Sequence, residues 1–124
     1  MTEAAASSQW LRGLLDVCLL ATLAQEPRYG YEMTRHLADA GLGVAEGSIY
    51  PALGRLERAG LIEGFLREGA GGPPRKYYRL TRSGAEVLEQ RTAEWGRFSD
   101  GVGSVLAAAS ASTSASGKKG ASRG

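Results

Sequence analysis

The sequence predicts a small, mainly α-helical domain with one β-hairpin, and two observations support this prediction. Apolar residues recur at three- and four-residue intervals in four stretches, which is the period of an amphipathic helix. Between the third and fourth stretches, two β-favouring runs flank a segment rich in glycine and proline, which is typical of a hairpin. The 124 residues, 43% of them hydrophobic, are enough for one compact core.

The first predicted helix spans residues 10–24, where apolar residues recur every three or four positions from Leu11 to Cys18. Further apolar residues widen this stripe beyond what one neighbouring helix covers, which suggests burial against another subunit. Pro27 follows, and proline disfavours a continuing helix because it lacks a backbone N–H. Residues 1–9 are expected to form a flexible N-terminus.

Two shorter helices follow and meet across a turn that contains glycine. The first spans residues 30–40 and ends near Gly41, and the second ends at Gly60. Glycine commonly follows the last turn of a helix because it adopts a positive φ without strain. The inner face of the second helix is marked by apolar residues at helical spacing, Ile49, Leu53 and Leu56.

The C-terminal half is predicted to hold a hairpin, a helix and a tail. Residues 61–68 and 75–80 favour strands, and residues 69–74 between them are expected to form a long irregular tip. A last helix starts at Thr81 and continues to residue 106 with a nearly heptad apolar stripe. Residues 107–124 contain only Ala, Ser, Thr, Gly, Lys and Arg, so we expect a disordered tail.

The composition argues against several classes of function. One cysteine and one histidine leave too few ligands for the usual zinc sites or a Cys–His nucleophile pair, and no acid, base and nucleophile cluster together. We therefore expect neither an enzyme nor a cofactor or metal. The longest nearly apolar run, Val17–Ala24, has eight residues, whereas a membrane-spanning helix needs about 20. Without the features of a secretion signal, the protein is expected to be cytoplasmic.

The predicted order of elements is helix, helix, turn, helix, hairpin, helix, which is a winged helix–turn–helix with added N-terminal and C-terminal helices. In such a domain the second helix of the pair can lie in the DNA major groove, while the hairpin tip lies along the neighbouring backbone or minor groove. Residues 46–82, which include both elements, carry seven basic and four acidic side chains, a net charge of +3. The whole chain has a net charge of only +2, so the positive charge is concentrated in the segment that would contact DNA.

Four sequence blocks resemble the motifs of PadR-family transcriptional regulators: YGYE at 29–32, GSIYPALGRLE at 47–57, GLI at 60–62 and PRKYYRLT at 74–81. Their order and spacing make the resemblance specific, and it covers residues 10–106. It implies a DNA-binding domain at residues 10–82. It also implies a single C-terminal dimerisation helix at 83–106, as in the shorter subgroup, where the first and last helices build the dimer. Ala45-Glu46-Gly47 and Gly54 depart from the residues that many relatives carry.

The resemblance implies that the surface of the second helix lying off its apolar stripe faces DNA. Tyr50 is expected to hydrogen-bond a phosphate. Arg55 could bond either a phosphate or a guanine edge, which makes it the candidate for direct base reading. The alternative is an ordinary solvated helix face. Cations after the hairpin's diproline can reach phosphates, although strand-end solubility would also explain them. The predicted DNA-binding residues are Ser48, Tyr50, Pro51, Arg55, Arg75, Lys76 and Arg35.

Two tryptophans lie on the helices assigned to the dimer interface. Such a pair most simply contributes buried area, because an indole covers a large surface. The more specific alternative is a pocket for a small, flat aromatic effector between subunits, which is implied by resemblance to family members that act as multidrug sensors. The predicted residues of the effector pocket or dimer interface are Trp10, Leu14, Trp95 and Phe98.

Together these inferences predict a cytoplasmic, homodimeric, sequence-specific repressor that binds a pseudo-palindromic operator of double-stranded DNA. Two recognition helices related by a two-fold axis would contact half-sites about 34 Å apart. The alternative is a winged-helix protein-interaction module without operator specificity. Salt dependence distinguishes the two, because a protein that neutralises DNA phosphates loses affinity steeply as salt rises.

Overall fold

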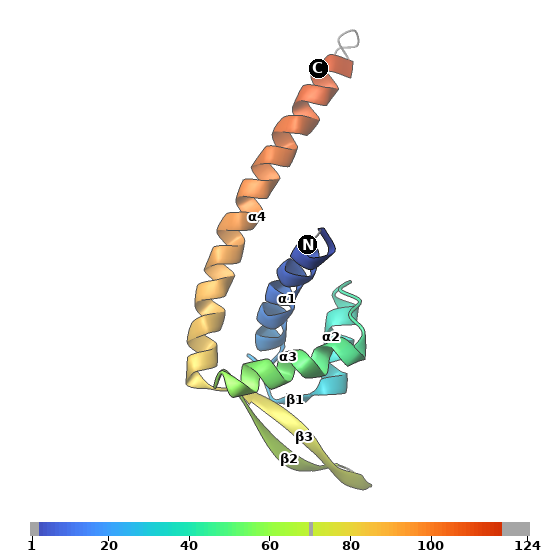
Figure 1. Cartoon of the computed structure of the whole chain (residues 1–124), viewed down its shortest axis with the longest axis vertical. Helices are drawn as coiled ribbons and strands as arrows, with labels where there is room; N and C mark the ends of the chain where they lie inside the picture. The colour runs from blue at the N-terminus through green and yellow to red at the C-terminus, as the bar shows by residue number, and fades with distance from the viewer. Residues whose placement is uncertain (1–2, 70, 118–124) are drawn as a thin grey trace. The chain divides into compact units, whose positions relative to one another are not determined.

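The computed structural model describes residues 3–69 and 71–117, with side chains described from residue 13 to residue 112. The chain divides into two compact units, Met1–Gln90 and Arg91–Gly124. The elements in chain order are α1 (Glu3–Thr22), β1 (Arg28–Tyr29), α2 (Gly30–Asp39), α3 (Glu46–Arg58), β2 (Ile62–Gly69), β3 (Gly72–Leu80) and α4 (Arg82–Gly117) (Figure 1). The predicted mainly α-helical fold with a small hairpin is confirmed.

The core of the first unit lies where α1, α2 and α3 meet the base of the sheet (Figure 1). All three residues predicted for the inner face of α3 are buried, because the helical period places them on one side of the helix. Each leucine or isoleucine buried in this way contributes about 1.5–3 kcal/mol. The buried hydrophobic residues are Leu19, Leu20, Leu23, Met33, Leu37, Ile49, Ala52, Leu53, Leu56, Ile62 and Tyr78.

The sheet has three antiparallel strands in the order β1-β3-β2. β1 was not predicted, because a two-residue strand has too few positions to show alternation. It pairs Arg28 with Tyr78 and Tyr29 with Tyr77, so the segment that precedes α2 is attached to the hairpin.

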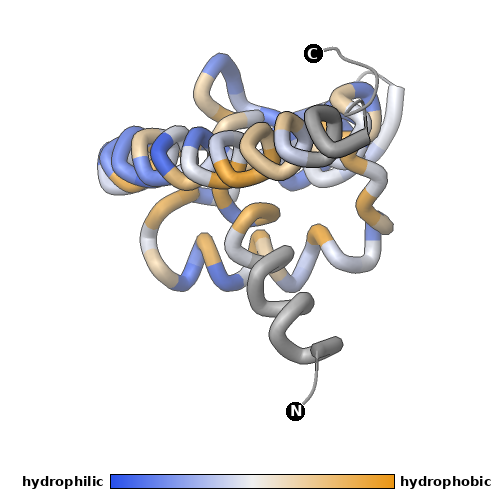
Figure 2. Tube along the Cα trace, turned by 90° about the horizontal axis from the view of Figure 1, so that it is seen from above, coloured by the Kyte–Doolittle hydropathy of each residue, from blue (hydrophilic) through white to orange (hydrophobic). Residues whose placement is uncertain are grey.

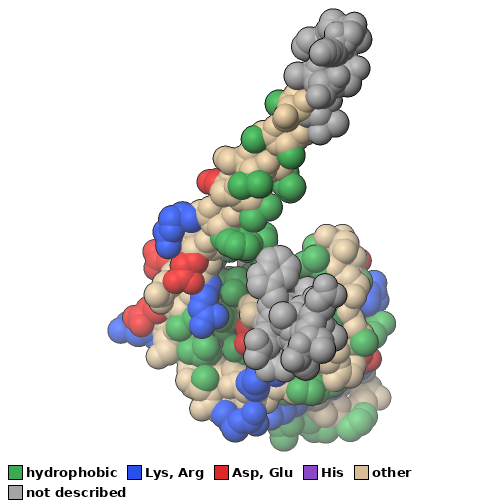
Figure 3. Space-filling view, turned by 45° about the horizontal axis from the view of Figure 1, so that its top comes forward, with side chains coloured by type: hydrophobic (Ala, Val, Ile, Leu, Met, Phe, Trp, Pro, Cys, Tyr) green, Lys and Arg blue, Asp and Glu red, His purple; other side chains and the backbone are tan. Residues whose placement is uncertain are grey.

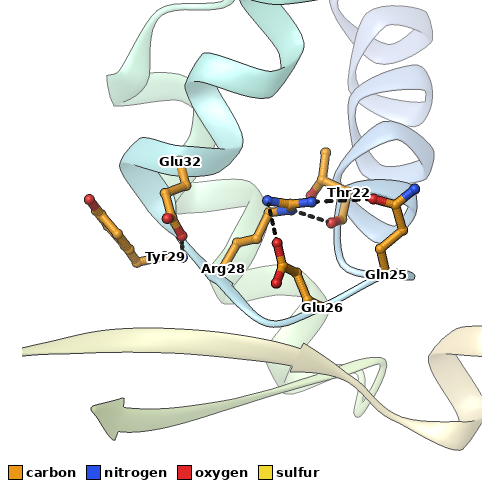
Figure 4. Close-up of polar contacts among 6 residues, drawn as sticks. All are labelled: Thr22, Gln25, Glu26, Arg28, Tyr29 and Glu32. Carbon is orange, nitrogen blue, oxygen red and sulfur yellow. Dashed lines mark hydrogen bonds and ion pairs between the residues drawn. The ribbon is translucent and has the colours of Figure 1, made fainter. Parts of the chain in front are cut away.

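Arg28 is buried and holds the connection between α1 and β1 (Figure 4). Its Nε donates a 2.7 Å hydrogen bond to the carbonyl oxygen of Thr22, and its Nη1 lies 3.3 Å from a carboxylate oxygen of Glu26. At the start of α2, the Tyr29 N–H donates to the Glu32 carboxylate at 3.2 Å. These contacts satisfy polar groups that would otherwise be left unpaired at two helix ends.

The tip of the hairpin is tighter than predicted. β2 reaches Gly69 and β3 starts at Gly72, so the prediction of an irregular segment is wrong at residue 69 and at residues 72–74. Pro73 and Pro74 fit into β3 because β1 pairs only with residues 77–78, which leaves this part of β3 unpaired on one side. Gly71 has a φ of +73°, a backbone conformation that glycine adopts without strain, directly before β3 begins.

Both long helices extend beyond their predicted limits. α1 starts at Glu3 and therefore includes residues 3–9 of the segment that was predicted to be a flexible N-terminus; its flexibility stays a prediction. α4 continues to Gly117 and therefore includes residues 107–117 of the segment that was predicted to be a disordered tail; residues 118–124 lie outside the described part of the chain. Alanine recurs in both stretches, and it has the highest helix propensity because it loses no side-chain entropy.

Thr81 starts α4 and attaches it to the end of α3. Its hydroxyl accepts a 3.0 Å hydrogen bond from the Gly84 N–H and donates one of 2.7 Å to the carbonyl of Gly60. The Thr81 N–H donates to the carbonyl of Leu61 at 3.1 Å. The first turn of α4 is therefore fixed to the loop between α3 and β2.

Hydrophilic residues interrupt the hydrophobic ones along the helices (Figure 2). Among the described residues, no helix is both long enough and apolar enough to cross a membrane.

Candidate nucleic-acid interface

The outer face of α3 is almost flat. Gly47, Pro51, Gly54 and Arg58 recur at helical spacing opposite the buried residues, and two of these four positions have no side chain. The Arg58 side chain is exposed and lies close to Gly54, where a Cβ would be 3.3 Å from the arginine Nη1. This face therefore presents backbone at Gly47 and Gly54, the small ring of Pro51 and one guanidinium, so another molecule can approach the helix closely.

Tyr50 lies at one side of this face and is 47% exposed. Its ring packs against the start of α2, where a Cβ at Gly30 would be only 2.6 Å from Tyr50 Cε1. The Tyr50 hydroxyl donates a 2.8 Å hydrogen bond to the carboxylate of Glu46. Partial burial and this hydrogen bond raise the pKa of Tyr50, so its hydroxyl stays protonated at neutral pH. Ser48 and Pro51 are exposed on the same helix.

Arg55 lies on the side of α3 that faces α1. Its Nη2 is 2.9 Å from Oδ1 of Asp16, and both side chains are largely covered. In this arrangement the guanidinium neutralises Asp16 instead of standing on the open face of α3. Base reading by Arg55 stays a prediction, and it requires the side chain to leave this ion pair.

Arg75 and Lys76 point to opposite faces of the hairpin because side chains alternate along a strand. Arg75 Nη1 donates a 2.9 Å hydrogen bond to the Tyr29 hydroxyl. Lys76 Nζ lies 3.2 Å from the carboxylate of Glu57 on α3, and this hydrogen bond raises the pKa of Lys76. Both cations are exposed at their strand positions.

Arg35 is exposed on α2, and its guanidinium carbon lies 5.9 Å from the ring centre of Tyr31. Contact with the Tyr31 hydroxyl and the nearby charge of Asp39 raise the pKa of Arg35. Arginine is charged at physiological pH, so this side chain is a cation on the surface of α2, and its contact with DNA stays a prediction.

The residues predicted for the effector pocket or dimer interface are distributed over α1 and α4. The side chain of Trp10 lies outside the described residues. Leu14 is half-buried and lines a groove of about 830 Å³ together with the turn between α2 and α3 and the first turns of α3. On α4, the rings of Trp95 and Phe98 are 5.8 Å apart, and the two residues are 43% and 47% exposed. Hydrophobic side chains gather along one side of α4 (Figure 3).

Two arginines of this region were not among the predicted site residues. Arg58 shares the outer face of α3 with Gly54, and Arg67 lies on β2 with its guanidinium carbon 4.2 Å from the ring centre of Tyr77. The helical period could have found Arg58, because it lies seven positions after Pro51. Strand alternation could have found Arg67, which shares a face of β2 with Phe65.

The described part of the chain also shows the surroundings of its potential metal ligands and of its single cysteine. It contains no group of three or more His, Cys, Asp and Glu side chains that could hold a metal ion. Cys18 is half-buried on α1, and burial raises the pKa of its thiol. Because the thiolate is the reactive form, this cysteine is a weak nucleophile at neutral pH.

Comparison with known proteins identifies the family of the chain. The model of the PadR-like transcriptional regulator family matches residues 19–90. An uncharacterised protein of Lysinibacillus sphaericus is 32% identical over 91 residues, which are 71% of this chain and 84% of that protein.

Solved structures with high similarity include a PadR-like transcriptional regulator from Bacillus cereus and a PadR-family transcriptional regulator from Eggerthella lenta. The Bacillus cereus protein is 44% identical with a TM-score of 0.72, and the match covers 79% of this chain and 96% of that one. The Eggerthella lenta protein is 39% identical with a TM-score of 0.69, covering 83% of this chain and 91% of that one. The chain belongs to the PadR-like family of transcriptional regulators.

Proposed function

We propose that this PadR-like regulator is a homodimeric repressor that binds a pseudo-palindromic operator in double-stranded DNA. The observation that carries the proposal is the outer face of α3, where Gly47 and Gly54 expose backbone and Arg58 supplies a cation. A helix needs such a narrow, basic face to enter the major groove and reach base edges. Within the cell, the proposed location is the cytoplasm, together with the DNA.

The proposed contacts fall into two groups. Ser48, Tyr50 and Pro51 are exposed on α3 and are proposed to contact DNA directly, with Arg35 bound to a phosphate from α2. The second group consists of cations that already contact a carboxylate or a hydroxyl of the protein, and each must leave this partner before it can bind DNA. Partly exposed ion pairs contribute only about 0–1 kcal/mol, so such an exchange costs little. Its members are Arg55 with Asp16, Lys76 with Glu57, and Arg75 with the Tyr29 hydroxyl.

The proposed dimer buries the apolar surfaces of α1 and α4. Exposed hydrophobic side chains on one helix favour association, because burial removes apolar area from water. A two-fold dimer would place two α3 helices about one DNA turn, roughly 34 Å, apart. A small aromatic effector is proposed to bind among Trp10, Leu14, Trp95 and Phe98 and to release the operator. The large exposed apolar residues of α4 are Trp95, Phe98, Val102, Val105 and Leu106.

The test is binding to the DNA directly upstream of the protein's coding sequence, measured by fluorescence anisotropy with unrelated DNA as competitor and across a salt series. We expect preference for the upstream DNA, two protomers per site, and a log affinity that falls with log salt at a slope near −0.9 for each phosphate neutralised. A reporter gene driven by this DNA should lose expression when the protein is supplied. Weak binding that is indifferent to sequence would refute an operator in this upstream DNA, and would point either to an operator elsewhere or to a protein-interaction module.

Two variants separate the proposed contacts. Arg75→Ala combined with Lys76→Ala should weaken binding to every sequence and flatten the salt slope, because both cations are proposed to bind phosphate. Arg55→Ala should chiefly reduce the preference at one operator position. Equal losses on all sequences from Arg55→Ala would show that this side chain contacts backbone only.

A further inference from the structure

Glu46 is the first residue of α3, and its side chain is exposed at the start of the helix that is proposed to enter DNA. It lies one turn before Tyr50, so both side chains follow the same side of the flat outer face. In a helix–turn–helix domain, the N-terminal residues of the second helix contact base edges. Glu46 therefore stands at a position from which a side chain can reach a base.

The charge of Glu46 is not compensated, unlike that of two other acidic side chains in this region. Glu57 on α3 lies 3.2 Å from Lys76. Glu63 on β2 lies 3.7 Å from Arg79. Among the described residues, Glu46 forms no ion pair, and its carboxylate contacts a neutral hydroxyl. An uncompensated carboxylate repels DNA phosphates, so it weakens binding unless the DNA offers it a hydrogen-bond donor.

Tyr50 holds the carboxylate of Glu46 in place. The Tyr50 hydroxyl donates a 2.8 Å hydrogen bond to Oε2 of Glu46. The Tyr50 ring is itself restrained, because it packs against the start of α2, where a Cβ at Gly30 would lie 2.6 Å from Cε1. Oε1 of Glu46 accepts no hydrogen bond from another described side chain, so it is open to a donor from DNA.

A structural role for Glu46 explains only part of this arrangement. A carboxylate in the first turn stabilises a helix by about 0.3–1 kcal/mol, because it complements the positive end of the helix dipole. That effect needs a negative charge near the first turn and nothing more. It does not explain why the side chain turns along the helix to the hydroxyl of Tyr50.

The major groove offers a carboxylate few partners. The donors on its base edges are the N4 amine of cytosine and the N6 amine of adenine. On adenine the N7 acceptor lies beside the amine, and it repels a carboxylate oxygen. Cytosine presents its amine without an acceptor on its own edge, and guanine and thymine present acceptors only. A carboxylate that faces the major groove therefore favours cytosine.

We propose that Glu46 reads a cytosine in the major groove, with Oε1 accepting a hydrogen bond from the N4 amine. Tyr50 is the positioning residue, because its hydroxyl holds the carboxylate through Oε2. This inference rests on the proposed operator binding and names one of its base preferences, a C·G pair at one position. The two-fold symmetry proposed for the dimer repeats that preference in both half-sites.

The experiment selects bound sequences from a library of randomised duplexes with the full-length protein, and sequencing gives the base preference at each position. The wild type should enrich a C·G pair at one position of each half-site. Glu46→Ala should reduce this preference about five-fold and keep the rest of the motif, because one hydrogen bond to a base is lost. Glu46→Gln should shift the position toward A·T, since an amide matches N6 and N7 of adenine.

The matched control is Glu86→Gln, which removes the same charge from an exposed position on α4. It should leave the selected motif unchanged. Fluorescence anisotropy with one random-sequence duplex should show tighter binding for both Glu46 variants than for the control, because a charge that repels phosphate is removed from the proposed interface. Thermal unfolding of each variant checks that the fold is kept.

Tyr50→Phe tests the positioning role, because it removes the hydroxyl and keeps the ring against Gly30. The C·G preference should fall about two- to three-fold, since the carboxylate regains rotamer freedom. Added to Glu46→Ala, the same change should cause no further loss of preference. A hydroxyl that bonds a phosphate would instead lower the affinity for all sequences equally and leave the preference intact, which would overturn the positioning role.

The outcomes separate this inference from the proposed function. A wild-type motif that persists unchanged in Glu46→Ala and Glu46→Gln would overturn base reading by Glu46, while operator recognition would stand. A preference that depends on Glu46 but favours a pair other than C·G would overturn cytosine as the contacted base. A wild type that enriches no motif would refute operator recognition, and base reading by Glu46 with it.

Discussion

Gly84 offers a sharp test of how the hairpin and α4 are joined, because it is buried in the first turn of α4. A Cβ at this position would overlap the carbonyl oxygen of Leu61 and lie 2.9 Å from Cδ1 of Leu80. The carbonyl cannot move freely, since it accepts the hydrogen bond from the Thr81 N–H. Gly84→Ala must therefore displace backbone and disturb the hydrogen bonds of Thr81.

The magnitude follows from two contributions. Overpacking a tight site costs about 1–3 kcal/mol, and losing the threonine cap costs about 1 kcal/mol more. We expect the free energy of unfolding to fall by about 3 kcal/mol. In a domain of this size, each 1 kcal/mol lowers the melting temperature by about 4–8 °C, so the expected decrease is about 12–24 °C.

Circular dichroism at a fixed protein concentration measures the melting temperature of the variant. The matched control is Gly96→Ala, because nothing lies within 4 Å of a Cβ there. Alanine in a helix interior is about 0.5–1 kcal/mol better than glycine, so the control should keep or slightly raise the melting temperature. If Gly84→Ala unfolds within about 3 °C of the wild type, the close packing of α4 against Leu61 is refuted.

Three further predictions concern α1, α2 and α3. Gly30→Ala should push the Tyr50 ring away from α2, and the cost in the free energy of unfolding should be below about 1 kcal/mol because the ring is the exposed end of a flexible side chain. The variant should nevertheless bind the operator more weakly, because the ring has left its place on α3. An unchanged affinity would contradict a contact between Tyr50 and DNA. Asp16→Asn should lower the free energy of unfolding by about 1 kcal/mol, and a double-mutant cycle with Arg55→Met that gives no coupling would contradict the ion pair. Cys18 should react with iodoacetamide at pH 7 more slowly than free cysteine, because burial raises the pKa of its thiol and the thiolate reacts; equal rates would contradict this burial.

Apolar residues at helical spacing predicted the helices correctly, whereas a short strand and a strand segment that depend on distant contacts were missed. α2 and α3 lie within two residues of their predicted limits at the C-terminal end, because their apolar spacing and terminal glycines are local features. β1 was missed, since its existence depends on pairing with Tyr77 and Tyr78 far along the chain. The diproline of β3 was read as a breaker, and its strand conformation depends on an unpaired strand edge that the sequence does not reveal.

The candidate site shows the same division. A helical wheel correctly separates Arg55 from the buried stripe of α3, but it does not reveal that α1 places Asp16 beside it. Alternation along β3 puts Arg75 and Tyr77 on one face, whereas the covering of Tyr77 by Arg67 depends on the register between strands. Contacts across elements therefore set which cations are available, and the sequence shows only which cations exist.

The pairing of β1 with β3 also sets an order on folding during synthesis. Arg28 and Tyr29 join residues that lie 48 or more positions later, Tyr77 and Tyr78, so this contact has the high sequence separation that slows folding. While the chain is being made, α1, α2 and α3 can pack before the hairpin exists, because α1 and α2 contact α3 directly. Tyr29, which directly precedes α2, gains its strand partner Tyr77 only when the hairpin is complete. A chain that ends before Tyr77 therefore lacks the strand partner that fixes the entrance to α2.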